Sequence, residues 1–527
     1  YNVIMENTVK STVTIEKLQT EIEILKQEKA ELEAKLKWFE EQFRLHQHKL
    51  FGRSSEKTEV PEQLNLFNEA ESEAKPAVPE PTLEEITYKR RKKQGHREEM
   101  LKDIPVETIE YRLPEEEQVC DCCGGKLHEM SKEVRREIEI IPAQVRVKEH
   151  VQYVYGCRNC EKNEISTPIV TAPMPKPALP GSLASASAIA HVMTEKFVKG
   201  LPLYRQEQDW ERMGIEISRQ TMANWMIQSS DRWLRPIYER MREHLQQRDI
   251  LHSDDTTLQV LKEPGRAADS TSYMWLYRTG REGPPIILYD YQTTRAGKHP
   301  KKFLEGFKGY LHTDGYDGYS GMPGIIQVGC WAHARRYFVD ALKAMPPKKD
   351  DKPTVTEEGL AFCNNLFEIE KMLHDVTPEE RYEGRLKHSR PVLDKFKEWL
   401  KYWSPRVTPK SSLGKAIQYC RNQWDKLEAF MLDGRLEIDN NRSERSIKPF
   451  VIGRKNWLFS NTPKGANASA TIYSIVETAK ENGLNPFEYL TYLFERLPNI
   501  NIKDQHALDT LLPWSANLPG HCKVPNK

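Results

Sequence analysis

The residues with the clearest chemical potential are two adjacent carboxylates in a stretch that otherwise has the pattern of a β-strand. In ILHSDDTTLQV, residues 250–260, Asp254 and Asp255 stand among alternating aliphatic residues. A carboxylate on the inner face of a strand is costly unless its charge is compensated. We expect a divalent cation to compensate it, because Mg²⁺ prefers hard oxygen ligands and leaves room for phosphate oxygens.

Two further carboxylates complete a candidate metal site. Asp314 ends a second predicted strand, YLHTD, and Glu444 lies in a predicted helix within EIDNNRSERSIKPFVIGRKNW. Neighbouring parallel strand ends would bring Asp254 and Asp314 together, and a helix covering the sheet would supply Glu444. The alternative for Glu444 is a set of surface ion pairs with the arginines beside it.

The cysteines indicate a second metal. Cys120 and Cys123 with Cys157 and Cys160 form two C-x2-C pairs separated by 33 residues. Each pair can present two thiolates to one tetrahedral ion, and four thiolates leave no open position, so we expect one structural Zn²⁺. A redox pair or simple buried thiols remain alternatives, because the interval is longer than usual.

The elements that must position these residues are distributed over several domains, since 527 residues exceed one ordinary core. We expect a multidomain α/β protein with a zinc-binding, DNA-binding module and a helical region before a mixed β-sheet flanked by helices and interrupted by a helical insertion. The predicted bounds are 1–55 for a coiled coil, 56–100 for a linker, 101–175 for the zinc module, 176–247 for the helical region, 248–345 and 436–495 for the sheet domain, 346–435 for the insertion and 496–527 for a tail.

The first 55 residues follow a heptad pattern. Apolar residues alternate at three- and four-residue spacing at Ile15, Leu18, Ile22, Leu25, Leu32, Leu36, Phe39 and Phe43. Lys29 interrupts this seam once, which favours a coiled coil of low order, most simply a homodimer. A single amphipathic helix that docks on its own protein is the alternative.

Two segments are candidates for contact with double-stranded DNA, because the formal net charge of +1 requires local rather than global attraction. The first is the basic run Lys89, Arg90, Arg91, Lys92 and Lys93, which is otherwise a solvated tail. The second is a predicted helix-turn-helix with a turn at Gly214, an N-cap at Ser218, and Gln220 and Asn224 on the second helix. Ordinary helix packing would give the same pattern.

The order of LHSDDT, LHTDGYDGY, GCWAHARRYF and IDNNRSERSIKPFVIGRKNWLFSNTPKGA closely resembles the transposases of the insertion-sequence-66 family. These belong to the DDE transposases, whose catalytic core is ribonuclease-H-like. The resemblance extends to the N-terminal coiled coil, the paired cysteines and the C-terminal tail, so it covers nearly the whole chain.

The resemblance implies a catalytic triad of Asp254, Asp314 and Glu444 that holds two Mg²⁺ ions. Asp255 stands where the family usually has Glu, and we expect its side chain to lie on the other face of the sheet. The implied activity is metal-dependent DNA strand cleavage and strand transfer at the ends of a mobile insertion element. The resemblance also implies accessory proteins encoded by the same element and a bacterial, nucleoid-associated location in the cytoplasm.

Further residues near these motifs are candidates for contact with DNA, since cations beside an aromatic ring suit a nucleic-acid track: Arg335, Arg336, Arg454, Lys455 and Trp457. Surface cations beside a core Trp are the alternative. We expect His333 to be a satisfied, partly buried histidine rather than a phosphate ligand. Lys448 receives no role, because Pro449 is expected to bias it out of the helix.

Two other functions remain open at this stage. One is a zinc-dependent DNA-binding regulator whose carboxylates are structural, and the other is a metal nuclease that never joins ends. No run approaches the ~18 apolar residues of a membrane span, and no basic start precedes a short apolar core, so we expect no membrane partner.

Overall fold

The computed structural model of the chain describes residues 144–156, 169–345 and 352–525, together with nine helical positions between Lys26 and Glu40. These residues divide between two compact units. Among them, 176–207, 217–345 and 352–523 belong to one unit, and 144–156, 169–175, 208–216 and 524–525 belong to the other. The heptad seam as a whole, the basic run and the four paired cysteines lie outside the described residues.

The smaller unit contains an antiparallel two-stranded ribbon. Strand β1 (Val154–Gly156) pairs with β2 (Ile169–Thr171). The backbone amide of Ala172 donates to the carbonyl of Tyr153 at 3.0 Å, and Nε2 of the Gln152 side chain donates to the carbonyl of Ala172 at 2.6 Å.

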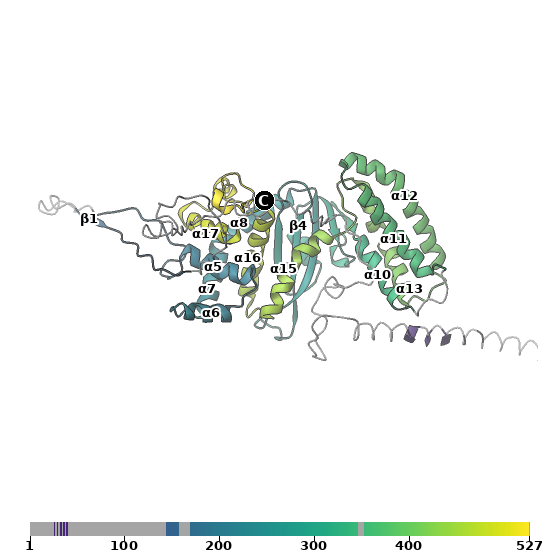
Figure 1. The fold of residues 1–527 in the computed structure, drawn as a ribbon, viewed down its shortest axis with the longest axis horizontal. Helices are drawn as coiled ribbons and strands as arrows, with labels where there is room; N and C mark the ends of the chain where they lie inside the picture. The colour runs from purple at the N-terminus through teal and green to yellow at the C-terminus, as the bar shows by residue number, and fades with distance from the viewer. Residues whose placement is uncertain are drawn as a thin grey trace, which may run out of the picture. The chain divides into compact units, whose positions relative to one another are not determined.

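The larger unit is built around a five-stranded mixed sheet in the order β5-β4-β3-β6-β7 (Figure 1). Its strands are β3 (Ile250–Gln259), β4 (Thr271–Thr279), β5 (Ile287–Gln292), β6 (Gly309–Thr313) and β7 (Ile325–Gly329). Strands β3, β4 and β5 are antiparallel, whereas β6 and β7 run parallel to β3. The prediction of a mixed sheet flanked by helices is confirmed.

The pairing of β3 with β6 sets the geometry of the candidate site. Their register places His252 opposite His312. The same register, continued by two residues, puts Asp254 opposite Asp314. The side chains of these two aspartates then lie on the same face of the sheet. The approach requires glycine at Gly309, where a Cβ would lie 2.2 Å from the carbonyl oxygen of Asp249.

Helices precede the sheet, as the sequence predicts. They are α5 (Ala186–Phe197), α6 (Leu203–Arg212), α7 (Arg219–Ser229), a π-helical turn (Ser230–Leu234) and α8 (Arg235–Gln246). The turn at Gly214 has φ of +84°. The Ser218 side chain accepts a hydrogen bond from the amide of Thr221, so the predicted N-cap of the second helix is confirmed.

A helical block lies between β7 and the last sheet-covering helices. It comprises α10 (Trp331–Lys343), α11 (Val355–Met372), α12 (Pro378–Trp403), α13 (Ser412–Asn422) and α14 (Trp424–Glu428). Helices α11 and α12 each begin with a capping box, at Thr354 and Thr377. Phe338, Phe396 and Trp331 are fully buried in its core.

The chain then returns to the sheet. The helices are α15 (Asn441–Trp457), α16 (Pro463–Glu481), α17 (Pro486–Arg496) and α18 (Gln505–Asp509), and the short α9 (Lys298–Phe303) precedes β6. Helix α15 packs on β3 and β4, while α16 packs on β5 (Figure 1). Ser474 and Thr478 of α16 accept hydrogen bonds from the amides of Tyr289 and Ile287, so the edge strand β5 is covered.

No helix among the described residues is long and apolar enough to cross a membrane.

The helical block depends on one buried ion pair. The Arg385 guanidinium donates to both oxygens of Glu370 at 2.7 Å. It also donates to the carbonyls of Phe430, Asp433 and Leu436 at 2.7–2.9 Å. Both side chains are almost completely buried, so removing either one leaves an uncompensated charge.

We expect Arg385→Ala to lower the free energy of unfolding by about 3–5 kcal/mol, because Glu370 loses its only described cationic partner in the core. Denaturant unfolding monitored by circular dichroism measures this. Lys401→Ala, which breaks the exposed pair with Glu398, is the control and should cost less than ~1 kcal/mol. Equal losses in the two variants would contradict the importance of the buried pair.

Candidate functional site

Asp254 is the buried centre of the candidate site. It lies on β3, and its Oδ1 accepts a hydrogen bond from the amide of Asp255 at 2.8 Å, while its Oδ2 is buried without a hydrogen-bond partner. Burial raises the pKa of Asp254 well above its usual value, and the nearby carboxylates of Glu444, Asp314 and Asp255 raise it further. Repulsion between these carboxylates is strong because Asp254 is buried and little water screens the charges.

Asp314 follows β6 directly and lies at the mouth of the site. Its Oδ1 accepts a hydrogen bond from the amide of Tyr316 at 3.0 Å, and its Oδ2 is 3.5 Å from Nη2 of Arg295. The same Arg295 donates to both oxygens of Asp255 at 3.0–3.1 Å. Burial raises the pKa of Asp255 to about 6, although Arg295 opposes the shift.

Asp255 therefore has a cationic partner of its own. Its carboxylate is held by Arg295, and the Arg295 guanidinium lies 4.0 Å from the ring centroid of Tyr316. Arg295 joins Asp255 to Asp314, so the neighbour of Asp254 still borders the site. Arg295 could not be recognised from the sequence, because it follows strand β5 in a polar turn without a distinctive motif.

Glu444 approaches from the first turn of α15. Its Oε1 is buried without a hydrogen-bond partner and lies 3.8 Å from Nδ1 of His333. Its Oε2 lies 3.7 Å from Nη2 of Arg336. His333 and Arg336 both come from the start of α10, so this helix and α15 meet at Glu444.

The donor set suits divalent cations. Among the described residues, the one group of three acidic, His or Cys side chains whose ligand atoms all lie within 4.8 Å of one another is Cys330, His333 and Glu444. The acids Asp254, Asp314 and Glu444 are spaced more widely. Two metal ions ~3.5–4 Å apart can share ligands that do not all contact one ion. Oδ2 of Asp254 and Oε1 of Glu444 are buried without a hydrogen-bond partner among the described residues, which leaves these oxygens available to cations.

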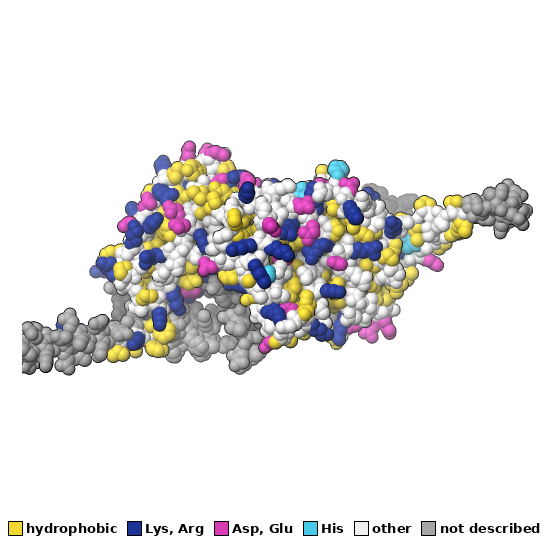
Figure 2. All heavy atoms as spheres, turned by 180° about the vertical axis from the view of Figure 1, so that it is seen from behind, with side chains coloured by type: hydrophobic (Ala, Val, Ile, Leu, Met, Phe, Trp, Pro, Cys, Tyr) yellow, Lys and Arg dark blue, Asp and Glu magenta, His cyan; other side chains and the backbone are white. Residues whose placement is uncertain are grey.

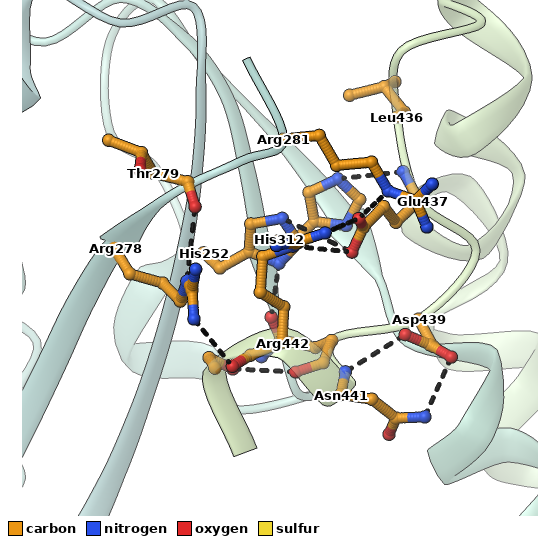
Figure 3. A network of polar contacts seen from close by, with 12 residues as sticks. His252, Arg278, Thr279, Arg281, His312, Leu436, Glu437, Asp439, Asn441 and Arg442 are labelled. Atoms are coloured by element: carbon orange, nitrogen blue, oxygen red, sulfur yellow. Dashed lines mark hydrogen bonds and ion pairs between the residues drawn. The ribbon is translucent and has the colours of Figure 1, made fainter. Parts of the chain in front are cut away.

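His252 and His312, two residues before Asp254 and Asp314 in the sequence, belong to a buried polar network (Figure 3). The rings of His252 and His312 are stacked, with centroids 4.2 Å apart. Glu437 lies beside them, 3.8 Å from Nε2 of His252, and accepts hydrogen bonds from Arg281 and Arg442 at 2.6 and 2.9 Å. Burial opposes ionisation of Glu437, but the guanidiniums of Arg442 and Arg281 hold its pKa well below the usual range.

Asn440 connects the network to three of the elements that surround the acids. Its Oδ1 accepts a hydrogen bond from Nδ1 of His252 at 3.0 Å, and its Nδ2 donates to the carbonyl of Ser253 at 2.9 Å. Its backbone amide donates to Sγ of Cys330 at 3.2 Å, and it is the N-cap residue of α15. One side chain thus joins β3, α10 and the helix that carries Glu444.

The residues predicted to contact DNA have different environments. Gln220 and Asn224 are exposed on α7, and Lys455 is exposed on α15. Arg335 and Arg336 are buried, and Nε of Arg335 donates to Asn364 of α11 at 2.7 Å. Arg335 thus stabilises helix packing here.

The two remaining candidates pack within the fold. Arg454 is buried, and its Nη1 donates to the hydroxyls of Thr256 and Thr257 at 3.3–3.4 Å. The half-buried ring of Trp457 packs against Phe197, with Nζ of Lys196 4.1 Å from a ring centroid.

Two sequence predictions are wrong. Pro449 does not remove Lys448 from the helix, because α15 continues through it to Trp457. A proline costs one hydrogen bond within a helix, and packing of α15 on the sheet outweighs that local preference. His333 is not satisfied either, since its buried Nδ1 has no hydrogen-bond partner and faces Glu444.

Comparisons with known proteins cover most of the chain. Residues 181–468 match a family model described as the transposase IS66 family. Residues 117–161 match the zinc-finger binding domain of transposase IS66, 474–514 the IS66 C-terminal element, and 38–109 a model described as transposase C of IS166 homeodomain.

Two similar proteins come from Sinorhizobium fredii. Uncharacterized protein y4jD is 31% identical over 417 residues, which cover 76% of this chain and 78% of that protein. Uncharacterized protein y4hP is 29% identical over 432 residues, which cover 78% of this chain and 75% of that protein.

An acidic centre on a mixed sheet, within a chain matched by transposase and zinc-finger domains, defines a DNA transposase. The chain belongs to the transposase IS66 family. The family resemblance predicted from the four sequence motifs is confirmed.

We expect the buried histidines to make stability depend on pH. Burial lowers the pKa of His252 to about 4 and that of His312 well below its usual value. Between about pH 6.5 and 4, these histidines bind protons in the unfolded chain but stay neutral in the folded chain. Their contribution to the free energy of unfolding is therefore present above this window and is lost as the pH falls through it. Within this window, the free energy of unfolding falls by up to about 1.4 kcal/mol per pH unit for each histidine.

The variant His252→Gln should reduce this slope by about one histidine's share, measured by urea unfolding between pH 7 and 4. The control is His506→Gln, which changes an exposed histidine on α18. An acid slope that is the same in His252→Gln and the native chain would show that His252 is not buried in its neutral form.

Proposed function

We propose that this chain is a DDE transposase that cleaves the ends of a mobile DNA element and joins them to a target by in-line phosphoryl transfer. Asp254, Asp314 and Glu444 are the catalytic residues and hold two Mg²⁺ ions. The single observation that carries this proposal is the parallel register of β3 and β6, which aligns Asp254 with Asp314 beside the helix α15 that packs on β3 and carries Glu444. A purely structural site has little use for carboxylates that repel one another.

The strand arrangement supports a ribonuclease-H-like core. Three antiparallel strands are followed by two strands parallel to β3, and the acids come from β3, from the end of β6 and from a helix packed on the sheet. The family match supports a nucleic-acid-modifying enzyme rather than a non-enzymatic DNA-binding regulator.

The two Mg²⁺ ions and the protein side chains would have different roles in the reaction. Two bound Mg²⁺ ions would supply activation of the attacking oxygen and stabilisation of the leaving oxygen. A P–O bond forms to water as the bond to the 3′-oxygen breaks, and the freed 3′-hydroxyl then attacks a target phosphorus in the same way. Asp254, Asp314 and Glu444 fix the reacting centre, while Arg295 holds Asp314 in place. No covalent protein intermediate is required.

Recognition of double-stranded DNA is assigned to several segments. The exposed Gln220 and Asn224 of α7 would read base edges, and the basic run 89–93 would follow the phosphates. On the face seen in Figure 2, Lys and Arg side chains are interspersed with Asp and Glu, so positive charge does not cover this whole face. Local contacts must therefore carry specificity.

The N-terminal segments complete the proposed assembly. Cys120, Cys123, Cys157 and Cys160 would hold one structural Zn²⁺, within the part of the chain matched by the zinc-finger domain. A homodimer formed through the coiled coil of residues 1–55 would bring two element ends together, with accessory proteins of the element assisting.

Asp314→Asn should reduce Mg²⁺-dependent cleavage of element-end DNA by at least about 100-fold, because one of the side chains proposed to bind the two Mg²⁺ ions loses its negative charge. The assay follows labelled end DNA with Mg²⁺ and with EDTA, and strand-transfer products distinguish a transposase from a nuclease. Asp290→Asn, on the edge strand β5, is the matched control and should retain cleavage. Undiminished cleavage by folded Asp314→Asn would exclude the triad.

Alanine at Gln220 or Asn224 should weaken binding to the element end by about 1–3 kcal/mol for each lost base contact. Binding to unrelated DNA should change little, since the phosphate contacts remain. Fluorescence anisotropy at fixed salt measures both affinities. Equal weakening of binding to both DNAs would show that these side chains contact the DNA backbone rather than the bases.

A further inference from the structure

Three side chains of different chemistry meet where α10 and α15 begin. Cys330 is the N-cap residue of α10, His333 lies in its first turn, and Glu444 lies in the first turn of α15. One ligand atom from each lies within 4.8 Å of the other two. The triad assigned above uses only Glu444 of these three.

The atoms that face one another lack other partners. Oε1 of Glu444 and Nδ1 of His333 are buried, have no hydrogen bond, and are 3.8 Å apart. A buried acceptor without a partner costs about 1–3 kcal/mol, so both atoms gain from a shared ligand. The third member, Sγ of Cys330, is fully buried and accepts a hydrogen bond from the amide of Asn440.

We propose that Cys330, His333 and Glu444 form a second divalent-metal site, selective for ions of the zinc class over Mg²⁺. Sulfur and imidazole ligands suit Zn²⁺, whereas Mg²⁺ prefers oxygen. On binding, a metal–sulfur bond forms and the thiol releases its proton to solvent. The thiolate, the carboxylate and a neutral imidazole balance the ion's two charges, which suits a buried position.

The geometry requires only a small closure. Bonds of about 2.0–2.3 Å in a tetrahedron place ligand atoms about 3.5 Å apart. His333 and Glu444 are already close to this separation. Three protein ligands leave the fourth position open, unlike the predicted site with four cysteines.

The shared Glu444 gives the site a consequence that rests on the proposed function. An ion bound by Cys330 and His333 holds Oε1 of Glu444 on the α10 side of the site. Glu444 is then withdrawn from the Mg²⁺ pair centred on Asp254. Zinc-class ions therefore inhibit cleavage at a site separate from the structural zinc.

The first experiment counts bound metal. The full chain is dialysed against Zn²⁺ and its zinc content is measured, with Co²⁺ absorbance as a second readout of thiolate ligation. The native chain should bind one more ion per chain than Cys330→Ser and than His333→Gln. Cys363→Ser, which alters another buried free cysteine in the core of the helical block, is the matched control and should keep the full count. Equal counts in folded native chain and both site variants overturn the proposal.

The second experiment tests inhibition. Cleavage of element-end DNA is measured at constant Mg²⁺ with increasing Zn²⁺, and Cys330→Ser should need more than about tenfold more zinc for half-inhibition. The same zinc sensitivity in both proteins overturns the inhibitory role. A native chain that never cleaves in Mg²⁺ alone would instead refute the proposed function, while the metal count still decides the site.

Discussion

The repulsion between carboxylates gathered at Asp254 is the constraint on which the rest of the larger unit depends. Burial already disfavours the charge of Asp254, and three neighbouring acids add to the cost. The fold tolerates this because each of the other acids has a nearby basic group: Arg295 beside Asp255 and Asp314, and His333 and Arg336 beside Glu444. The strands and helices around the sheet therefore hold the acids in place against their mutual repulsion, with basic groups beside Asp255, Asp314 and Glu444.

The buried polar network fixes the positions of the acids without occupying their oxygens. Strands β3 and β6 each have a histidine two residues before an aspartate, so one parallel register stacks the two rings and aligns the two carboxylates. Asn440 then ties β3 to the start of α15. Charge in this layer is neutralised locally, since Glu437 is paired with Arg281 and Arg442. Rigid support of this kind lets the acids remain poorly satisfied.

Much of the sheet and its acids could be predicted, whereas most of their partners could not. The strands containing Asp254 and Asp314 show period-two patterning and end in turn residues, and the sequence order of motifs identified Glu444. Arg295 gave no periodic pattern, and its role depends on a turn that brings it back over β3. Arg335 and Arg336 looked like surface cations because a helix pattern does not show which face a later helix will cover. The local preference of a proline predicts that Lys448, the residue before Pro449, leaves the helix. This prediction fails because the sequence does not show that α15 packs on the sheet.

The helical block has a consequence for the order in which the chain is made. It separates β7 from α15, so a nascent chain carries both aspartates long before Glu444 leaves the ribosome. Asn440 and Glu437, which complete the buried network, arrive with the same late segment. A chain interrupted anywhere in the block thus lacks Glu444 and its anchor, so premature termination yields a fragment without the last acid of the proposed metal site.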